Sequence, residues 1–333
     1  MKPLLTIEGL ETRFKTYAGD VQAVRDVNLT VHEGEVLAVV GESGSGKSVT
    51  MMSVMRLLAK NAKITGKAMF GDRDLLQLSE KEMRKVRGRD IAMIFQDPMT
   101  GLNPTLTIGS QMRESMMYHL GMNRHDADKR AIELLQLVGV PEAPRRLSQY
   151  PHEFSGGMRQ RVMIAMSLSC NPRLIIADEP TTALDVTIQA QILELLKRLQ
   201  KEYGTAIIMI THNLGVVAGM ADRVAVMYGG RVAEMGTVEQ IFHNPTHPYT
   251  WSLLRAIPRL DETKRKLESI PGAPPNMLKP PGGCAFHPRC PFAMQACTEE
   301  APAMQALGNN QHSACWLNHK DAPKVDFPLE VTR

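Results

Sequence analysis

The chain has 333 residues, enough for about two domains at roughly 150 residues each. Hydrophobic residues make up 43% of it and charged residues 22%, a mixture that excludes fibrous, low-complexity and wholly disordered proteins. The formal net charge of +4 is too small an excess over this length to indicate nucleic-acid binding by itself.

No membrane-spanning or secretory segment is predicted. The apolar runs, such as residues 206–210, fall far short of the ~20 consecutive apolar residues that a spanning helix needs. Charged residues at positions 2, 8, 11 and 13 interrupt the region where a signal peptide would need an apolar core. A cytosolic location is therefore the default expectation.

The first 40 residues predict strands. Short apolar or β-branched runs, broken by turn residues, occur at 4–7, 23–24, 27–31 and 36–40. After Gly46 the apolar positions 51, 54, 55 and 58 recur at helical spacing, which predicts an amphipathic helix that packs on a sheet. A strand that feeds a helix through a glycine-rich loop is the start of an α/β unit.

The middle of the chain predicts helices followed by buried strands. Residues from about 98 to 171 have apolar positions at helical spacing, with one helix ending near Val138 and another covering 162–169. Short runs that are apolar throughout follow at 174–177 and 206–211, as expected of strands buried on both faces. We therefore predict a helical insertion in one continuing sheet.

The amino-acid composition changes beyond about Pro245. Prolines punctuate the chain, and the charged segment 261–268 predicts a linker into a small C-terminal module that holds four of the five cysteines. The predicted organisation is a nucleotide-binding domain over 1–245, with a helical subdomain inserted at about 97–171, and a linker with a four-cysteine module over 246–333.

Residues 41–48, GESGSGKS, satisfy the pattern G-x-x-x-x-G-K-[ST] between an apolar strand and an amphipathic helix. In this context backbone N–H groups and the helix N-terminus cradle phosphates. Lys47 is predicted to reach the β- and γ-phosphates and Ser48 to bind Mg²⁺. The alternative, a chance glycine-rich turn, is disfavoured by the flanking elements. The residues predicted to contact the nucleotide here are Gly41, Ser43, Gly44, Ser45, Gly46, Lys47, Ser48 and Val49.

Residues 174–179, LIIADE, form an apolar strand that ends in two carboxylates. Asp178 is predicted to bind Mg²⁺ and Glu179 to act as the general base. Taken alone, the segment could be a strand that ends in surface acids. Together with the phosphate loop it predicts a P-loop NTPase, a class that includes kinases, GTPases, helicases and motors.

Residues 154–161, FSGGMRQR, resemble the signature motif of ATP-binding cassette (ABC) ATPases. Other motifs of that family follow its order: Gln96 matches the Q-loop glutamine, residues 182–185 (TALD) the D-loop, and His212 the switch histidine. Each has an ordinary structural explanation when taken singly. The resemblance implies an α/β cassette with a RecA-like mixed sheet, an antiparallel β subdomain and a helical subdomain.

The resemblance also implies roles. Glu179 is the general base, Gln96 senses Mg²⁺ and a transmembrane partner, and His212 contacts the γ-phosphate. Two ATP molecules lie between two cassettes, each bound by the phosphate loop of one chain and the signature of the other, so an isolated chain should hydrolyse ATP poorly. The residues implied on the signature and D-loop side are Ser155, Gly156, Gly157 and Asp185.

Two positions depart from the family pattern, and one assignment is open. Asn213 replaces the usual aspartate after the histidine, and Met158 replaces the common glutamine of the signature, a variant that the peptide-importer branch shares. Tyr17 is the candidate for the aromatic residue that stacks on adenine, with Phe14 as the alternative.

The whole length resembles the larger ATPase subunit of bacterial oligopeptide and dipeptide permeases. The strings that carry the resemblance are residues 94–104, 150–154, 181–187 and 247–250. It implies a peripheral subunit on the cytoplasmic face of the inner membrane that binds two transmembrane permease subunits and a sister ATPase. It also implies uptake of peptides, oligopeptides by preference over dipeptides, that an extracytoplasmic binding protein delivers.

The helical insertion near Gln96 is implied as the site that docks on the permease subunits. Met112, Met116 and Met117 lie in this insertion, and adaptable apolar side chains suit a groove that follows a moving partner helix. Core packing is the alternative for each of these methionines.

Cys284, Cys290, Cys297 and Cys315 are spaced C-x₅-C-x₆-C-x₁₇-C, which is neither a zinc-finger nor a ferredoxin pattern. Four thiols in a cytosolic protein favour metal binding over disulfides. A short segment poor in apolar residues also needs a cross-link, such as a metal site, to stabilise its fold. The family resemblance implies a [4Fe–4S] cluster. Zinc, with His287 or His312 as substitute ligands, and four unligated thiols are the alternatives. Cys170 is predicted to be a small buried apolar residue.

Two other functions are alternatives to transport. A soluble ABC ATPase that acts on ribosomes or DNA normally carries two fused cassettes or a coiled-coil insertion, and the sequence shows neither. A regulatory protein with vestigial hydrolysis is disfavoured because Lys47, Asp178, Glu179 and His212 are intact. We therefore expect ATP and Mg²⁺ as ligands, transport-coupled hydrolysis as the activity, and no nucleic-acid partner.

Overall fold

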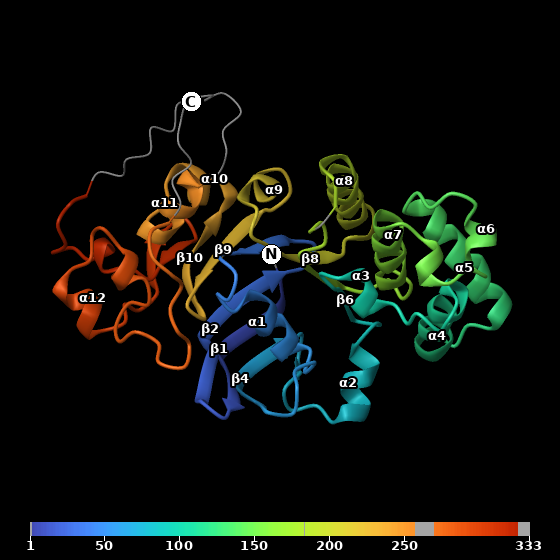
Figure 1. Ribbon diagram of the computed structural model, residues 1–333, viewed down its shortest axis with the longest axis horizontal. Helices are drawn as coiled ribbons and strands as arrows, with labels where there is room; N and C mark the ends of the chain where they lie inside the picture. The colour runs from blue at the N-terminus through green and yellow to red at the C-terminus, as the bar shows by residue number, and fades with distance from the viewer. Residues whose placement is uncertain (1, 183, 257–269, 326–333) are drawn as a thin grey trace. The chain divides into compact units, whose positions relative to one another are not determined.

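The computed structural model describes residues 2–182, 184–256 and 270–325 (Figure 1). The predicted charged linker segment 261–268 and Ala183 of the D-loop motif lie outside the described residues. The chain divides into two compact units. Unit one comprises residues 1–3, 31–36 and 77–210, and unit two comprises residues 4–30, 37–76 and 211–333.

Unit two contains an antiparallel sheet with strand order β2-β1-β4-β5. Its strands are β1 (Pro3–Thr16), β2 (Gly19–His32), β4 (Ala62–Phe70) and β5 (Arg73–Asp74). The runs predicted as separate strands at 23–24 and 27–31 belong to the single strand β2. Asp26 has a φ of 53°, and the local irregularity lets both Val24 and Val27 face the core, as in a β-bulge.

The second set of strands in unit two has the order β11-β12-β10-β9-β3. β3 and β9 are parallel, and the other pairs are antiparallel. The strands are β3 (Val36–Val40), β9 (Arg223–Tyr228), β10 (Arg231–Thr237), β11 (Gln305–Gly308) and β12 (Gln311–Ser313). β3 was predicted from its apolar run, whereas the strands after residue 222 were not. Residues from the cysteine-containing segment thus continue a sheet that begins beside the phosphate loop.

The helices of unit two are short. They are α1 (Lys47–Val54), α9 (Leu214–Ala218), α10 (Val238–His243), α11 (Pro248–Arg255) and α12 (Gln295–Glu299), with 3₁₀ turns η2 (His287–Arg289) and η3 (Trp316–Asn318). The helix predicted after Gly46 is confirmed, but it ends at Val54, so the predicted position 58 lies beyond it. Arg56 has a φ of 52°, a left-handed conformation in which a right-handed helix does not continue.

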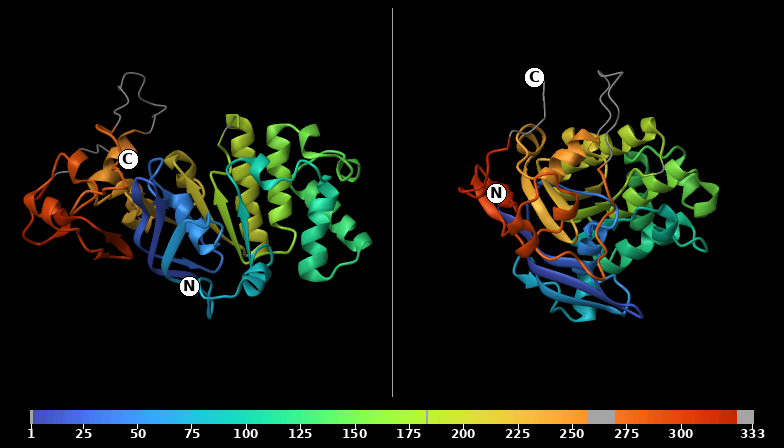
Figure 2. Two further views of the ribbon diagram at one scale, coloured as in Figure 1. Left: turned by 60° about the horizontal axis from the view of Figure 1, so that its bottom comes forward. Right: turned by 60° about the vertical axis from the view of Figure 1, so that its left-hand side comes forward.

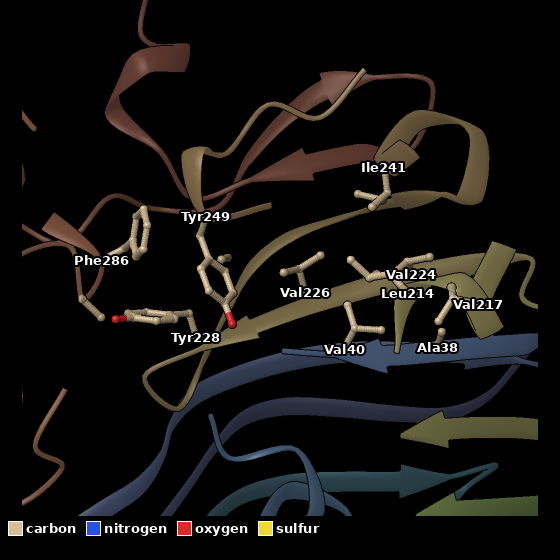
Figure 3. Close-up of a cluster of buried hydrophobic side chains, with 12 residues drawn as sticks. Ala38, Val40, Leu214, Val217, Val224, Val226, Tyr228, Ile241, Tyr249 and Phe286 are labelled. Carbon is tan, nitrogen blue, oxygen red and sulfur yellow. The ribbon is translucent and has the colours of Figure 1, made fainter. Parts of the chain in front are cut away.

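One buried apolar cluster joins the C-terminal part of unit two to β3 and β9 (Figure 3). Val40 and Val226 lie in its middle, and the aromatic rings of Tyr228, Tyr249 and Phe286 lie at one end. The ring centroids of Tyr228 and Tyr249 are 4.5 Å apart, and those of Tyr249 and Phe286 are 5.3 Å apart. Burial of large aromatic side chains therefore fixes residues 249 and 286 against β9, the parallel neighbour of the strand that leads to the phosphate loop.

Unit one contains the parallel strands β6 (Ile91–Ile94), β7 (Leu174–Asp178) and β8 (Ala206–Thr211), with β7 paired to both neighbours. All residues of β7 and β8 are buried, which confirms the two apolar runs as internal strands. The helices α2 (Glu80–Val86) and α8 (Val186–Tyr203) also belong to this unit. β7 ends at the predicted Mg²⁺ ligand, Asp178.

The stretch between β6 and β7 is helical, as predicted. It contains α3 (Pro98–Gly101), α4 (Ile108–Leu120), α5 (Arg124–Leu137), α6 (Ala143–Arg146), the 3₁₀ turn η1 (Pro151–Glu153) and α7 (Gly156–Ser167). Figure 1 and both views of Figure 2 show α4, α5 and α7 grouped together. The side chains of Thr107, Asn123 and Ser155 cap α4, α5 and α7.

The side chains of this helical region settle two predictions. Met112 and Met116 are fully buried and pack in the core, whereas Met117 is 45% exposed, so only Met117 of the three is available to a partner surface. Cys170 is 6% exposed, which confirms it as a buried small residue. None of the helices in the described ranges combines the length and apolarity required to cross a bilayer.

Candidate nucleotide site

The phosphate loop leaves the buried strand β3 through a backbone that only glycine allows. Gly41 has a φ of 151°, and a Cβ there would collide with the carbonyl oxygen of Met227. Gly46, the N-cap of α1, has a φ of 100°, and its Cβ would lie 2.6 Å from the carbonyl oxygen of Ala23. Gly44 has a φ of 79° and open space beside it. Glycine is therefore required by close approach at two positions and by conformation at the third.

Lys47 lies inside the curve of the loop. Its side chain is 5% exposed, and Nζ donates hydrogen bonds to the carbonyl oxygens of Gly41 (2.8 Å) and Glu42 (3.0 Å). Ser45 is buried, and its Oγ has no hydrogen-bond partner among the described residues. Ser48 lies in the first turn of α1 and is half-buried. The loop thus concentrates an ammonium group and hydroxyls at a helix N-terminus, the arrangement that binds phosphate.

In unit one, the strand β7 brings the two predicted carboxylates to its end. Asp178 is 6% exposed, and Glu179 has a φ of 46°, an unusual value for a residue other than glycine. The Glu179 carboxylate accepts hydrogen bonds from Nε2 of Gln96 (3.0 Å) and Oγ1 of Thr182 (2.8 Å). The Q-loop glutamine and the predicted base, 83 residues apart in sequence, are therefore in direct contact.

The signature segment begins a helix with exposed small residues. Ser155 and Gly156 are exposed, and the Ser155 Oγ accepts a hydrogen bond from the backbone N–H of Met158 (3.3 Å). A Cβ on Gly157 would lie 3.2 Å from the side chain of Ile188 in α8. Asp185 caps α8 by accepting a hydrogen bond from the Ile188 N–H (2.9 Å), so the D-loop aspartate and the signature glycine share a neighbour.

The switch histidine and the candidate adenine-stacking residues belong to unit two. His212 follows β8 and is exposed, and Asn213 caps α9 by accepting a hydrogen bond from the Gly215 N–H (2.9 Å). Asparagine therefore retains the side-chain acceptor that an aspartate would supply at this position. Tyr17, between β1 and β2, is fully exposed, and Phe14 is half-buried. The choice between these two aromatic residues stays a prediction, with the exposed Tyr17 ring the more accessible.

The four C-terminal cysteines are free thiols and lie near one another. Cys297 and Cys315 are each 7% exposed, and Cys284 and Cys290 are half-buried. Burial, together with the neighbouring thiols Cys284 and Cys297, raises the pKa of Cys290 to about 11, and burial likewise raises the pKa of Cys315 to about 12. Within residues 2–325, apart from 183 and 257–269, no three His, Cys, Asp or Glu side chains are arranged to hold a metal ion. The geometry thus gives the predicted [4Fe–4S] ligation no direct support.

Two further residues reach the phosphate loop and were not predicted as site residues. The Tyr249 hydroxyl accepts a hydrogen bond from the Glu42 N–H (2.8 Å), and the Arg289 guanidinium forms an ion pair with the Glu42 carboxylate (2.6 Å). These contacts join residues 207 and 247 positions apart. No local pattern in the sequence marks such contacts, although Tyr249 lies in the string HPYT that carried part of the resemblance.

Comparison with family models gives two matches. The ABC transporter model matches residues 24–182, and the model for the C-terminal region of oligopeptide/dipeptide transporters matches residues 233–297. The first covers the phosphate loop, the signature and the two carboxylates. The second covers Tyr249, Arg289 and three of the four clustered cysteines.

Similar proteins cover almost the whole chain. The oligopeptide transport ATP-binding protein of Bacillus subtilis is 55% identical over 98% of this chain and 92% of its own length. The dipeptide transport ATP-binding protein of the same organism is 53% identical over 97% of each chain. Among solved structures, a dimeric ATP-binding cassette in a post-hydrolysis state, bound to ADP and phosphate, has a TM-score of 0.64 and 30% identity. The match covers 70% of this chain and 98% of that one.

Proposed function

The chain belongs to the oligopeptide and dipeptide transport ATP-binding proteins of the ABC transporter family, and within that family we propose a role for each part of the site. The protein is an ATPase that powers peptide import. Its fold is the predicted P-loop ABC cassette with a mixed sheet and helices. The two-domain organisation, 1–245 with a helical subdomain at about 97–171 and a C-terminal module over 246–333, is part of the proposal.

The observation that supports the catalytic assignment most directly is the environment of Glu179. Its carboxylate accepts hydrogen bonds from Gln96 and Thr182, which fix its orientation. The left-handed backbone at Glu179 is a conformation that costs about 1–3 kcal/mol and persists where function requires it. We assign Glu179 to accept the proton of the attacking water, and Gln96 to hold that carboxylate and sense the permease subunits.

The phosphate loop binds the nucleotide. The backbone N–H groups of residues 43–49 and the Lys47 ammonium hold the β- and γ-phosphates, and Tyr17 stacks on the adenine. Ser48, Gln96 and Asp178 are the proposed Mg²⁺ ligands, a set of oxygen donors that suits this hard cation. When bound, Mg²⁺ neutralises charge that develops on the phosphate oxygens. His212 is assigned to the γ-phosphate.

The signature segment acts on the nucleotide of another subunit. Ser155, Gly156 and Gly157 lie at the N-terminus of α7, a helix of 12 residues, and the first two are exposed. An exposed serine beside backbone N–H groups suits a γ-phosphate presented by a sister ATPase. We therefore propose a heterodimer in which hydrolysis needs both chains, with Asp185 at the contact between them.

Replacement of Glu179 tests the assignment of the general base. In the assembled transporter, Glu179→Gln should bind ATP with nearly normal affinity but lose roughly 10²–10⁴-fold in turnover, because the amide cannot accept the proton. The matched control is Glu194→Gln, which changes an exposed carboxylate on α8. Turnover of Glu179→Gln equal to that of the control would remove Glu179 from the mechanism.

We propose that the subunit is peripheral on the cytoplasmic face of the inner membrane, where it contacts two transmembrane permease subunits. An extracytoplasmic binding protein delivers the peptides, oligopeptides by preference. Exposed Met99, Met117 and Tyr118 in the helical stretch that follows the Q-loop supply apolar surface for docking. Mild detergent extraction with a tag on this chain should recover two multi-span proteins and a second cassette. Recovery of ribosomes or DNA would instead support the alternative of a soluble ABC ATPase.

We further propose that the four clustered cysteines bind a [4Fe–4S] cluster. The support is chemical: the four thiols are neighbours, and the backbone N–H of Met294 donates a hydrogen bond to the sulfur of Cys297 (3.5 Å). Hydrogen bonds to sulfur are a common feature of such sites. When bound, the cluster would tie together residues 284–315 and could carry one electron.

Metal analysis of anaerobically purified protein tests this ligand set. The full chain should contain about four irons and visible absorbance, and Cys290→Ser should lose both while remaining folded. The control is Cys170→Ser, because Cys170 belongs to unit one whereas the other four cysteines belong to unit two. Zinc in place of iron would favour the alternative, and retained iron in Cys290→Ser would exclude Cys290 as a ligand.

A further inference from the structure

Glu42, the second residue of the phosphate loop, is held through all of its polar groups. Its backbone N–H donates to the Tyr249 hydroxyl (2.8 Å), and its carbonyl oxygen accepts from Nζ of Lys47 (3.0 Å). Its two carboxylate oxygens accept from the two terminal nitrogens of Arg289, at 2.6 and 3.0 Å. The residue that holds the phosphate-binding lysine is therefore itself held by two side chains from the C-terminal part of unit two.

Arg289 is placed with little freedom. Its side chain is 4% exposed, and its remaining donors bind the carbonyl oxygens of Pro271 (2.8 Å) and Ile270 (3.2 Å) and the Tyr228 hydroxyl (3.1 Å). The hydrogen bonds to Glu42 hold the pKa of Arg289 above its usual range. A buried, two-pronged pair between guanidinium and carboxylate has a fixed geometry, which a lysine cannot reproduce.

The two anchoring residues come from different parts of the C-terminal region. Tyr249 lies in α11, and its ring packs against both Tyr228 and Phe286 at one end of the buried cluster (Figure 3). Arg289 ends the 3₁₀ turn η2 and directly precedes Cys290. The position of Glu42 therefore depends on how residues 248–256 and 270–290 are folded, and not only on the strand, loop and helix that contain it.

We propose that Arg289 and Tyr249 are positioning residues for ATP binding, which act through Glu42 on Lys47, so that the folded C-terminal region sets the affinity of the phosphate loop for ATP. This inference rests on the proposed role of that loop in binding ATP. Neither residue touches the nucleotide in this scheme. Their contribution is to hold the loop in the conformation that binds phosphate, which lowers the conformational cost of binding.

The test is a double-mutant cycle on the full chain, with Arg289→Lys, Glu42→Gln and the two combined. Arg289→Lys should weaken binding of Mg·ATP, measured by calorimetry, by about tenfold, because lysine cannot form the two-pronged pair that holds Glu42. In the assembled transporter KM for ATP should rise while kcat changes little. Because Arg289 acts through Glu42, the double variant should bind ATP no more weakly than either single variant.

Tyr249→Phe gives a second measurement that preserves the buried ring and removes only the hydroxyl that accepts from Glu42. It should weaken ATP binding about fivefold, within the range expected for one hydrogen bond. Lys279→Gln, an exposed change in the same region, is the control. The thermal midpoint of each variant shows whether it is folded.

Two results would overturn the inference. One is unchanged ATP affinity in folded Arg289→Lys and Tyr249→Phe. The other is an additive loss in the double variant, which would mean that Arg289 acts independently of Glu42. In both cases the unaltered chain still binds ATP, so the proposed function stands. Failure of the unaltered chain to bind Mg·ATP would instead reject the proposed function together with the inference.

Discussion

The phosphate loop and the signature segment are both glycine-containing turns into a helix, yet they are held in different ways. In the phosphate loop Ser45 and Lys47 are buried, and Glu42 is held by side chains more than 200 residues away in sequence. In the signature segment Ser155 and Gly156 are exposed, the cap is formed locally by the Ser155 side chain, and a Cβ on Gly156 would meet nothing among the described residues within 4 Å.

The difference matches the two proposed tasks. A loop that binds phosphate within one chain gains affinity when its conformation is already formed, because ordering it during binding costs free energy. A segment that meets a nucleotide on another subunit must keep its small residues accessible. The comparison therefore predicts that changes in the phosphate loop affect folding and binding within one chain, whereas changes in the signature affect only the assembled transporter.

The largest expected effect is that of Gly41→Ala, compared with Gly156→Ala. At Gly41 the new Cβ collides with the Met227 carbonyl at a φ of 151°, so we expect a loss of about 4 kcal/mol in the free energy of unfolding. At Gly156 the space is open and alanine favours the helix, so the change should lie within about 0.5 kcal/mol. Urea denaturation measures both. Equal effects would show that the two loops are not held differently.

The second prediction concerns pH and the helix that carries Tyr249. Burial lowers the pKa of His247 from 6.5 to about 4, and its Nδ1 accepts a hydrogen bond from the Tyr249 N–H (3.0 Å). Below pH 6.5 the unfolded chain binds a proton that the folded chain does not. The contribution of His247 to stability should therefore fall by roughly 3 kcal/mol as the pH falls from 7 to 4.

His247→Asn isolates this contribution to the pH dependence. Asparagine can cap α11 in the same way but does not titrate. The free energy of unfolding of this variant should therefore lose less between pH 7 and pH 4, and the difference from the unaltered chain should be most of the roughly 3 kcal/mol. Burial raises the pKa of the neighbouring Glu234, which has the opposite effect on the pH dependence in both variants. The measurement is the free energy of unfolding at several pH values. An unchanged difference between pH 7 and pH 4 would contradict the assignment to His247.

The third prediction concerns the signature. Ser155→Arg places a long cation at an exposed position, so ATP binding by the single chain should change less than about twofold. Turnover of the assembled transporter should fall about 100-fold, equivalent to about 2.7 kcal/mol, because the arginine occupies the space intended for the γ-phosphate of the other subunit. Calorimetry and ATPase assays give the two values. Equal losses in both assays would mean that the signature also shapes the nucleotide site of its own chain.

The smallest expected effect separates two roles of Asp185. Asp185→Ala should cost about 1 kcal/mol in stability, because the cap on α8 is lost, whereas Asp185→Ser should retain most of it. If Asp185 also acts at the contact between the two ATPases, Asp185→Ser should still reduce turnover. Denaturation and ATPase assays on both variants distinguish the cap from the contact. Normal turnover in Asp185→Ser would limit the residue to its capping role.

The sequence alone determined the nucleotide chemistry and the main α/β elements. The loop from Gly41 to Ser48, the buried strands β7 and β8 and the helical stretch after Gln96 are all marked by local patterns, because hydrophobic periodicity and glycine positions record nearby geometry. The order of the motifs was enough to indicate an ABC ATPase.

Tertiary structure decided what depends on distant residues. The runs 23–24 and 27–31 form one strand, β2, with an irregularity at Asp26. Met112 and Met116 are buried, whereas Met117 is exposed, and β9–β12 lie in one sheet. Tertiary structure also brought Arg289 and Tyr249 to Glu42. Contacts of this kind follow from how side chains pack around a shared core and leave no periodic trace in the chain, so the phosphate loop was predicted but the residues that hold it were not.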